Sequence, residues 1–296
     1  MQRRIIQQSA SSMGISLPSK WIKENNLKKG DSLNLEIVKK TIQITSDKKQ
    51  TEKRHISLNI PSSGETAVRM LIVSAYRLGY DTIKVNVQEK NNFNSIKKLI
   101  NQIAEKNLIG FEMISSSKEG VIIESVAEPD YDNFHVLIEK QFFIIQGIIE
   151  NLLMENISHS SNLVQKYDNF LKRCISKRIL SIHNDPSLWQ MLTYLTRISR
   201  SCLYFNKYLQ KSHVKLSNKE EKLFNEVKEL FIQLKNSYFK KDQKLLFSLH
   251  EKHHKILRED IHSLMKKNNP VAIHFIAEIL DNIYYTTSSI TAIIEE

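Results

Sequence analysis

The feature that most constrains the fold is a helix-start signal that recurs at a long interval in the second half of the chain. Asp185 precedes Pro186, and Asn269 precedes Pro270, so that each pair offers a helix cap followed by proline at the first helical position. The two prolines lie 84 residues apart. Helical periodicity surrounds both signals, and we therefore predict that residues 131–296 are helical throughout.

A second pair of helix starts repeats with nearly the same spacing. Ser217 and Glu220 form a capping-box pattern, and the helix that they open lies 85 residues after one that we expect to begin near Asp132. Two nearly equal spacings indicate an internal duplication. We therefore predict a six-helix bundle made of two three-helix repeats, about 131–213 and 217–296.

The middle of the chain, residues 55–128, alternates between strand and helix patterns. The strand-like segments are HISLNI, TIKVNV, GFEMISS and GVIIESV, and an amphipathic helix separates the first from the second and the second from the third. This order predicts a small α/β layer, for which the sequence suggests no role beyond that of a spacer. The apolar stripe predicted for the first helix comprises Ala67, Leu71, Ser74, Ala75 and Leu78.

The first 50 residues read as four short strands and one short helix. Strand-like alternation occurs in RRIIQ, MGISLP, SLNLEIV and TIQIT, Pro18 lies where a helix begins, and Gly30 serves a turn before Asp31. A unit of about 45 residues buries little apolar surface by itself, so we expect it to need a partner, most simply a second copy. Its expected core residues are Ile15, Leu17, Trp21, Leu27, Leu33 and Leu35.

Cationic charge is concentrated at the front of the chain. The formal net charge is +11. Residues 1–54 hold 12 lysines and arginines against five acidic residues, a balance of +7, whereas the remaining 242 residues carry only +4. A basic segment of this kind attracts a polyanion through counterion release. The alternative is a solvated basic surface on a dimerising barrel.

Composition excludes several classes of protein. Hydrophobic residues make up 41% of the chain and charged residues 25%, as in a folded globular protein. The longest apolar runs, such as 142–149, fall short of the roughly 20 residues that span a bilayer, and the first residues lack the apolar core of a secretion signal. We therefore expect a cytoplasmic protein without a membrane span. Cys174 and Cys202 lack metal-ligand spacing and are expected to be small buried residues.

The stretch HEKHH at 250–254 satisfies the His-Glu-x-x-His pattern of zinc metalloproteases. On a helix, however, Leu249 and His253 occupy the centre of the apolar stripe, and His250 and His254 lie on its margin. No third ligand with a recognised spacing follows. We therefore expect packing here rather than zinc hydrolysis. Because the sequence also shows no phosphate-cradling glycine loop and no nucleophile elbow, we do not expect an enzyme.

The opening segment carries two adjacent motifs, Gly-x-x-Leu-Pro-x-x-Trp from Gly14 to Trp21 and Leu-Lys-x-Gly-Asp from Leu27 to Asp31. They resemble the AbrB-type (SpoVT-AbrB) swapped-hairpin DNA-binding domain in its archaeal variant. The duplicated bundle is similar to PhoU, the phosphate-uptake regulator, whose helices carry the motif Glu-Arg-Ile-Gly/Ala-Asp-His. The fusion resembles the archaeal PhoU-family phosphate-uptake regulators with an N-terminal AbrB-type domain.

This resemblance implies a multidomain α+β protein that forms a homodimer and lays a basic face on DNA. The expected parts are an AbrB-like swapped-hairpin β-barrel (1–50), a small α/β middle domain (55–128) and an all-α PhoU-like bundle (131–296). Arginine reads guanine and lysine neutralises phosphate. The candidate DNA contacts are accordingly Arg3, Arg4, Lys20 and Lys23.

The implied function is a cytoplasmic transcriptional regulator of phosphate uptake and homeostasis, in which the bundle receives a phosphate-status signal through a partner. One alternative is an adaptor that docks on a phosphate transporter or sensor and uses the N-terminal barrel only to dimerise. Another is an antitoxin-like role. Antitoxins of this kind usually end in a short disordered tail, however, and here about 240 residues with folding patterns follow.

The bundle departs from the PhoU motif where that family binds metal. TRISRS at 196–201 aligns with the first copy of the motif, so that Thr196 and Arg200 replace both metal-binding acids. In the second copy, AEILDN at 277–282 keeps Asp281 but neither the glutamate nor the histidine. One carboxylate makes a poor metal site by itself.

Other residues on the preceding helices leave a second interpretation open. Asp168 aligns with the family's acidic stretch, and His253 and His254 take the equivalent place in the second repeat. A residual site for iron, zinc or another divalent metal, formed by His253, His254 and Asp281, is one interpretation. The other, which we favour, is a bundle kept for assembly and signalling that no longer holds clustered metal ions.

Overall fold

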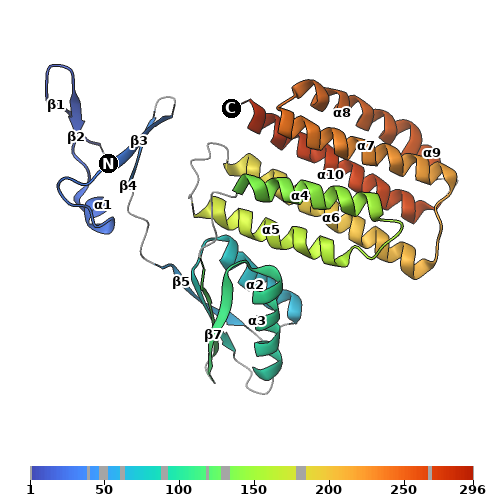
Figure 1. Ribbon diagram of the computed structural model, residues 1–296, viewed down its shortest axis with the longest axis horizontal. Helices are drawn as coiled ribbons and strands as arrows, with labels where there is room; N and C mark the ends of the chain where they lie inside the picture. The colour runs from blue at the N-terminus through green and yellow to red at the C-terminus, as the bar shows by residue number, and fades with distance from the viewer. Residues whose placement is uncertain are drawn as a thin grey trace. The chain divides into compact units, whose positions relative to one another are not determined.

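The computed structural model describes residues 2–38, 41–46, 53–60, 64–87, 93–117, 120–127, 134–177, 185–265 and 269–295 (Figure 1). The chain is mostly helical, with strands in its first half and helices alone in its second half. It divides into two compact units, Met1–Lys53 and Arg54–Glu296. The predicted middle domain and bundle therefore lie together in the second unit.

The first unit contains two short hairpins and a helix. Strands β1 (Ile5–Gln7) and β2 (Met13–Ile15) pair antiparallel, helix α1 spans Ser19–Glu24, and β3 (Leu33–Val38) pairs antiparallel with β4 (Thr41–Ser46). Pro18 stands at the start of α1, and Gly30 has a φ of 95° in the turn before β3. The local patterns thus predicted each element, because turn and cap chemistry is read within a few residues.

None of the side chains described in the first unit is buried. The expected core is therefore wrong for the single chain: Ile15 is 53% and Leu35 is 65% exposed, and the other four residues are only half-buried. The two hairpins are separate two-stranded sheets. An isolated hairpin of this kind is marginally stable in water.

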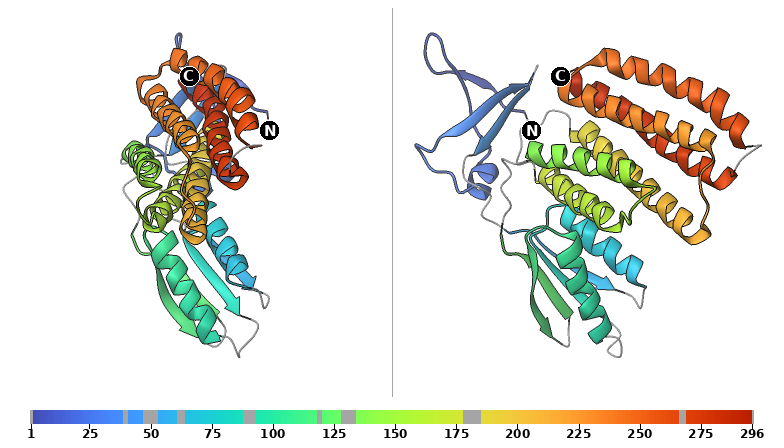
Figure 2. Two further views of the ribbon diagram at one scale, coloured as in Figure 1. Left: turned by 90° about the vertical axis from the view of Figure 1, so that its right-hand side faces the viewer. Right: turned by 45° about the vertical axis from the view of Figure 1, so that its right-hand side comes forward.

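The second unit begins with a four-stranded sheet. Its strands are β5 (His55–Ile60), β6 (Thr82–Val87), β7 (Phe111–Ser117) and β8 (Gly120–Ser125), in the order β5-β6-β8-β7. Helix α2 (Glu65–Arg77) crosses between the parallel strands β5 and β6, and α3 (Phe93–Asn107) leads to β7. Both helices cover one face of the sheet (Figures 1 and 2), over a core that includes Val68, Ile83 and Ile100.

The buried face of α2 differs from the predicted stripe. The buried residues are Val68, Ile72, Ala75 and Tyr76, whereas Leu78 is 53% exposed. Of the predicted stripe only Ala75 is buried. The prediction failed because α2 packs against the sheet on one side and against α5 of the bundle on another, so that its contact face is not the one with the most regular apolar spacing.

The rest of the second unit is a helical bundle. Its helices are α4 (Phe134–Asn151), α5 (Ser158–Ser176), α6 (Asp185–Ser212), α7 (Asn218–Lys240), α8 (Gln243–Lys255), the π-helical segment η3 (Ile256–Ile261), α9 (His262–Met265) and α10 (Pro270–Ile294). The long helices α6 and α10 pack against each other (Figure 1). Helices α4 and α5 pack against α6, and helices α7 and α8 pack against α10. Within the described residues, no helix is long and apolar enough to cross a membrane.

Cap chemistry explains where two of these helices begin. Ser217 and Glu220 form the predicted capping box at α7, and the Asn269 side chain accepts hydrogen bonds from the backbone N–H groups of Val271 and Ala272 at α10. The predicted start near Asp132 lies outside the described residues. The Glu220 carboxylate also accepts the backbone N–H of Asn269 at 3.0 Å, which ties the starts of α7 and α10 together.

A buried polar network joins the α/β layer to α5. Arg173 and Lys177 both contact the Asp81 carboxylate, at 2.5 and 2.6 Å. Asp168 pairs with Arg77 at 2.7 Å and with Lys172 at 2.8 Å. Asp168, which aligned with an acidic stretch, therefore serves this interface. The interface explains why the α/β layer and the bundle form one compact unit.

Candidate functional site

The first candidate site is the basic surface of the first unit. Arg3 and Arg4 precede β1, while Lys20 and Lys23 lie one turn apart on α1, and all four side chains are exposed. Among the residues that the structure describes, Lys20 pairs with Glu24 at 3.8 Å, and such an exposed pair contributes little. All four cations are thus available to an anionic partner.

Two further cations lie on the turn after α1. Lys28 and Lys29 are exposed there, and the Lys28 backbone N–H donates to the Asp31 carboxylate at 2.6 Å. Asn26 before them and Gly30 after them both have positive φ angles, of 50° and 95°. The turn therefore has a defined shape. The candidate DNA contacts named from the sequence do not include these two lysines, although the Lys-Lys-Gly-Asp turn marks them.

The second candidate site is a groove between α6 and α10, which we call the α6–α10 groove. It has a volume of about 450 Å³. The two helices run antiparallel, since Tyr194 contacts Tyr285 at one end and Tyr208 contacts Asn269 at the other. The lining side chains are Arg197, Arg200, Ser201 and Tyr204 from α6, and Glu278, Asp281, Asn282 and Tyr285 from α10.

The groove coincides with the two motif positions singled out in the sequence. Segment 196–201 lies on one wall and segment 277–282 on the other. Arg200 lines the groove together with the exposed Arg197, whereas Thr196 is buried. One wall is therefore basic and the other acidic.

Three of the four charged side chains contact a neighbour on their own side of the groove. Arg200 donates to the Tyr204 hydroxyl at 2.8 Å, and the Arg197 guanidinium lies 5.6 Å from the centre of the Tyr194 ring. On the other wall, Asp281 is 3.0 Å from the Nε2 atom of His253. No ion pair crosses the groove among the residues that the structure describes.

The histidines of α8 lie next to the acidic wall. His253 is buried and stacks on Tyr284 with ring centres 4.1 Å apart, and its Nδ1 atom has no hydrogen-bond partner. The Nε2 atom of His253 lies within hydrogen-bond distance of the Asp281 carboxylate, so His253 links α8 to the acidic wall. His250 contacts the Thr287 hydroxyl at 2.7 Å, so it also has a packing role.

The proposed metal ligands are only partly brought together. His253 and Asp281 form a hydrogen bond, but His254 is exposed and its ring stands edge-on to that of His253. Within the described ranges, no three His, Cys, Asp or Glu residues are placed to hold a metal ion. Consecutive helical residues point in different directions, which explains why His254 does not join. A metal ion at this position stays a prediction.

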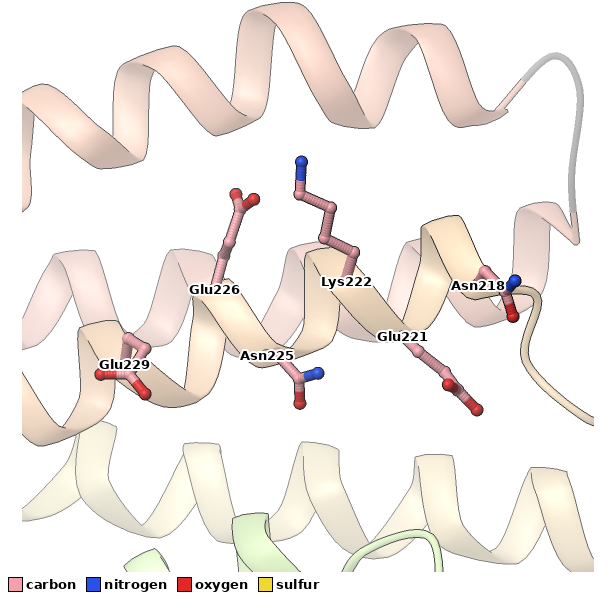
Figure 3. A pocket seen from close by; sticks show the side chains of 6 residues that line it. All are labelled: Asn218, Glu221, Lys222, Asn225, Glu226 and Glu229. Carbon is pink, nitrogen blue, oxygen red and sulfur yellow. The ribbon is translucent and has the colours of Figure 1, made fainter.

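The two cysteines and a hollow on α7 are poor candidates for a site. Cys174 and Cys202 are both buried, and burial raises the pKa of the Cys202 thiol far above its usual value. A hollow of about 370 Å³ lies on the outer surface of α7. Figure 3 shows that its lining side chains all come from this one helix, among them Glu221, Lys222 and Glu226. Without a second wall, it provides no enclosed site.

No known protein family, curated protein or solved structure matches the chain.

Proposed function

We propose that this protein is a DNA-binding transcriptional regulator of phosphate uptake that acts as a homodimer in the cytoplasm. The observation that carries the proposal is the state of the first unit, which combines exposed cations with strands that have no core. The α/β layer and bundle would then form the part that receives the signal. No catalytic activity is part of this proposal.

The uncovered strands support dimerisation. Seven large apolar residues of the first unit are between 53% and 77% exposed: Ile5, Ile6, Met13, Ile15, Leu35, Ile37 and Ile42. Ile5 lies opposite Ile15 and Ile37 lies opposite Ile42, so that apolar pairs run across both hairpins. Burying one such side chain stabilises a structure by about 1.5–3 kcal/mol. Interleaving with a second copy, as the resemblance to AbrB-type domains implies, would provide that burial.

The charge of the same unit supports DNA as the ligand. The balance of +7 over residues 1–54 favours a polyanion, and a dimer would double it. Arg3, Arg4, Lys20 and Lys23 are the proposed contacts, and all are exposed. The motif from Gly14 to Trp21 includes the end of β2 and the start of α1, and the motif from Leu27 to Asp31 forms the turn before β3.

Regulation requires that the second unit favours one state of the dimer. An effector that binds the bundle changes DNA affinity only if it binds the DNA-bound and free forms differently. The resemblance to PhoU suggests a phosphate-status signal delivered by a transporter or signalling partner. A divalent metal ion in the bundle would be a further input of this kind.

The alternative function is an adaptor of a phosphate transporter or sensor, in which the first unit only dimerises. The α6–α10 groove favours the adaptor, because a protein of that kind needs a binding surface in the bundle. The two functions differ in one property, since only the regulator binds a specific DNA sequence.

The test is selection of bound fragments from a random DNA pool at about 0.15 M salt. It compares the full chain, the chain without residues 1–53, and the variant Arg4→Ala. We expect one enriched sequence motif with the full chain, and its loss in both altered proteins. Weak binding without enrichment, unchanged by the truncation, would contradict the regulator and favour the adaptor.

A further inference from the structure

We propose that the α6–α10 groove is a binding site for a small zwitterion. The anionic end of the ligand would lie against Arg197 and Arg200, and its cationic end against Glu278 and Asp281. This inference goes beyond DNA binding, since it concerns the bundle alone and names a class of ligand. It uses no metal ion.

The separation of charge between the two walls carries the inference. Arg197, Arg200, Glu278 and Asp281 all line one cavity, with both cations on α6 and both carboxylates on α10. A ligand with a single charge would be attracted by one wall and repelled by the other. A ligand that carries both charges gains from each wall, provided that its ends point the right way.

The contacts within each wall keep these charges available. The Tyr204 hydroxyl holds Arg200, the Tyr194 ring lies near Arg197, and His253 holds Asp281. Because these partners belong to the same side of the groove, the walls keep their charges without closing on each other. Binding therefore costs little rearrangement, which is the advantage of a preorganised site.

The floor and the ends of the groove define the rest of the ligand. Ser201 and Asn282 are 2% and 6% exposed and offer a hydroxyl and an amide between the walls. The Asn282 amide N–H donates to the backbone carbonyl of Glu278, which fixes its orientation. Tyr204 and Tyr285 are 45% and 48% exposed and provide aromatic surface. A short chain between two charged ends would lie beside these hydroxyl, amide and aromatic groups.

The volume of the groove limits the size of the ligand. A cavity of about 450 Å³ falls within the range of small-molecule sites, about 300–1,000 Å³. The hollow on α7 differs from the groove in one respect (Figure 3). Its lining also includes a lysine, Lys222, and glutamates, but all of its lining residues belong to one helix. Mixed charge at a surface is therefore insufficient, and the second wall distinguishes the α6–α10 groove.

The experiment is titration calorimetry on the full chain with a series of ω-amino acids. Glycine, 4-aminobutyrate and 6-aminohexanoate place an ammonium group at increasing distance from a carboxylate, so that the series measures the width of the groove. Butyrate, butylamine and inorganic phosphate are the single-charge probes. We expect one zwitterion to bind at least about tenfold more tightly than any single-charge probe.

Four variants locate the binding. Arg200→Ala and Glu278→Gln are each expected to weaken the preferred zwitterion by about tenfold or more, because each removes one charge from one wall. Asp281→Asn should also weaken binding, but it changes the contact with His253 as well. Glu278→Gln leaves that contact unchanged and is therefore the clearer test of the acidic wall. Lys222→Ala, in the hollow on α7, is the matched control and should leave binding unchanged. Thermal unfolding of each variant confirms that it is folded.

Three results would overturn the proposal. One is that no zwitterion of the series binds at concentrations up to about 10 mM. This limit is well above a Kd of about 1 mM, so it would detect even weak binding. Another is equal binding of butyrate or inorganic phosphate, which would make the site one for anions alone. The third is binding that Arg200→Ala and Glu278→Gln leave intact. None of these results bears on DNA selection, so the two proposals fail separately.

Discussion

Asp81 is the residue on which the contact between the α/β layer and the bundle is centred. Its carboxylate accepts hydrogen bonds from Arg173, Lys177 and the backbone N–H of Arg54. Arg173 is fully buried and also donates to the backbone carbonyl of Tyr80 at 2.6 Å. A buried guanidinium needs a charged partner, since its transfer out of water is costly. Asp81 therefore determines whether Arg173 is tolerated in the interior.

The first prediction concerns Asp81→Asn. We expect the substitution to lower the free energy of unfolding at pH 7 by about 3 kcal/mol, because it removes the buried negative charge that Arg173 and Lys177 both contact. Urea unfolding of the second unit measures this change. Glu65→Gln is a suitable control, since the pair of Glu65 with Arg69 is largely exposed. A loss of stability no larger than in the control would show that the network does not hold the interface.

The second prediction is that the contribution of Asp81 to stability depends on pH. Burial acts to raise the pKa of Asp81, but the hydrogen bonds from Lys177 and the Arg54 N–H, with the charges of Lys177 and Arg173, outweigh it and hold the pKa below its ordinary value of 3.8. The stability from Asp81 is therefore present above about pH 4 and is lost as pH falls through the lower pKa of the folded state. Urea unfolding between about pH 5 and pH 2 should show this loss in the wild type and a flatter curve in Asp81→Asn.

His250 predicts a second pH dependence, closer to neutrality. Burial lowers its pKa from 6.5, and the charges of His254 and His253 lower it further. The unfolded chain therefore takes up this proton first, and stability falls as pH drops from about 6.5 to the pKa of the folded state. His250→Gln should flatten that part of the stability curve, measured by thermal unfolding between pH 7 and pH 5. An unchanged slope would mean that His250 titrates alike in both states.

At the scale of single elements, a helix cap links two distant helix starts. Ser217 and Glu220 cap α7. Glu220 is only 2% exposed, and its second carboxylate oxygen accepts a hydrogen bond from the Asn269 backbone N–H at the start of α10. Capping side chains satisfy backbone donors that the helix itself leaves unpaired. Because Glu220 satisfies donors of both helices, its effect should exceed that of an ordinary cap.

The corresponding prediction compares Ser217→Ala with Glu220→Ala. Ser217→Ala removes one cap and is expected to cost about 1 kcal/mol of unfolding free energy. Glu220→Ala also leaves the Asn269 N–H without its acceptor, and we expect about 2–3 kcal/mol. Both values come from chemical unfolding under the same conditions. Equal losses in the two variants would mean that the link between α7 and α10 contributes nothing.

The elements also show which parts of the fold the sequence predicts. The caps at Ser217 and Asn269 are local chemistry and were predicted correctly, as was the burial of His253 at the centre of the α8 stripe. The contact of Arg173 with Asp81 joins residues 92 positions apart and has no local signal. The stripe of α2 was predicted wrongly because that helix has two packing partners. The α6–α10 groove is an intermediate case. The alignment with a family motif singled out its two segments in the sequence, but only the fold showed that their opposite charges line one groove.

At the scale of the whole molecule, the two units differ in how they obtain a core. The second unit has two apolar cores of its own, one under the α/β layer and one in the bundle. The first unit has no buried side chain among those described. A segment with seven exposed large apolar residues is stable only if something covers them. The second unit thus has cores of its own, whereas we propose that the first unit obtains its core by association with a second copy.

This difference leads to the last prediction, at Ile37. Ile37 is 77% exposed in the single chain, and substitution of such an exposed residue normally changes stability by less than about 0.5 kcal/mol. If the first unit is covered by a second copy, Ile37→Lys should instead convert the dimer to a monomer and abolish DNA binding. Light scattering after size-exclusion chromatography measures the mass. Phe247→Lys, on α8, is the matched control because Phe247 is 61% exposed. A monomeric wild type, or an Ile37→Lys variant that stays dimeric and binds DNA, would contradict the swapped-hairpin dimer.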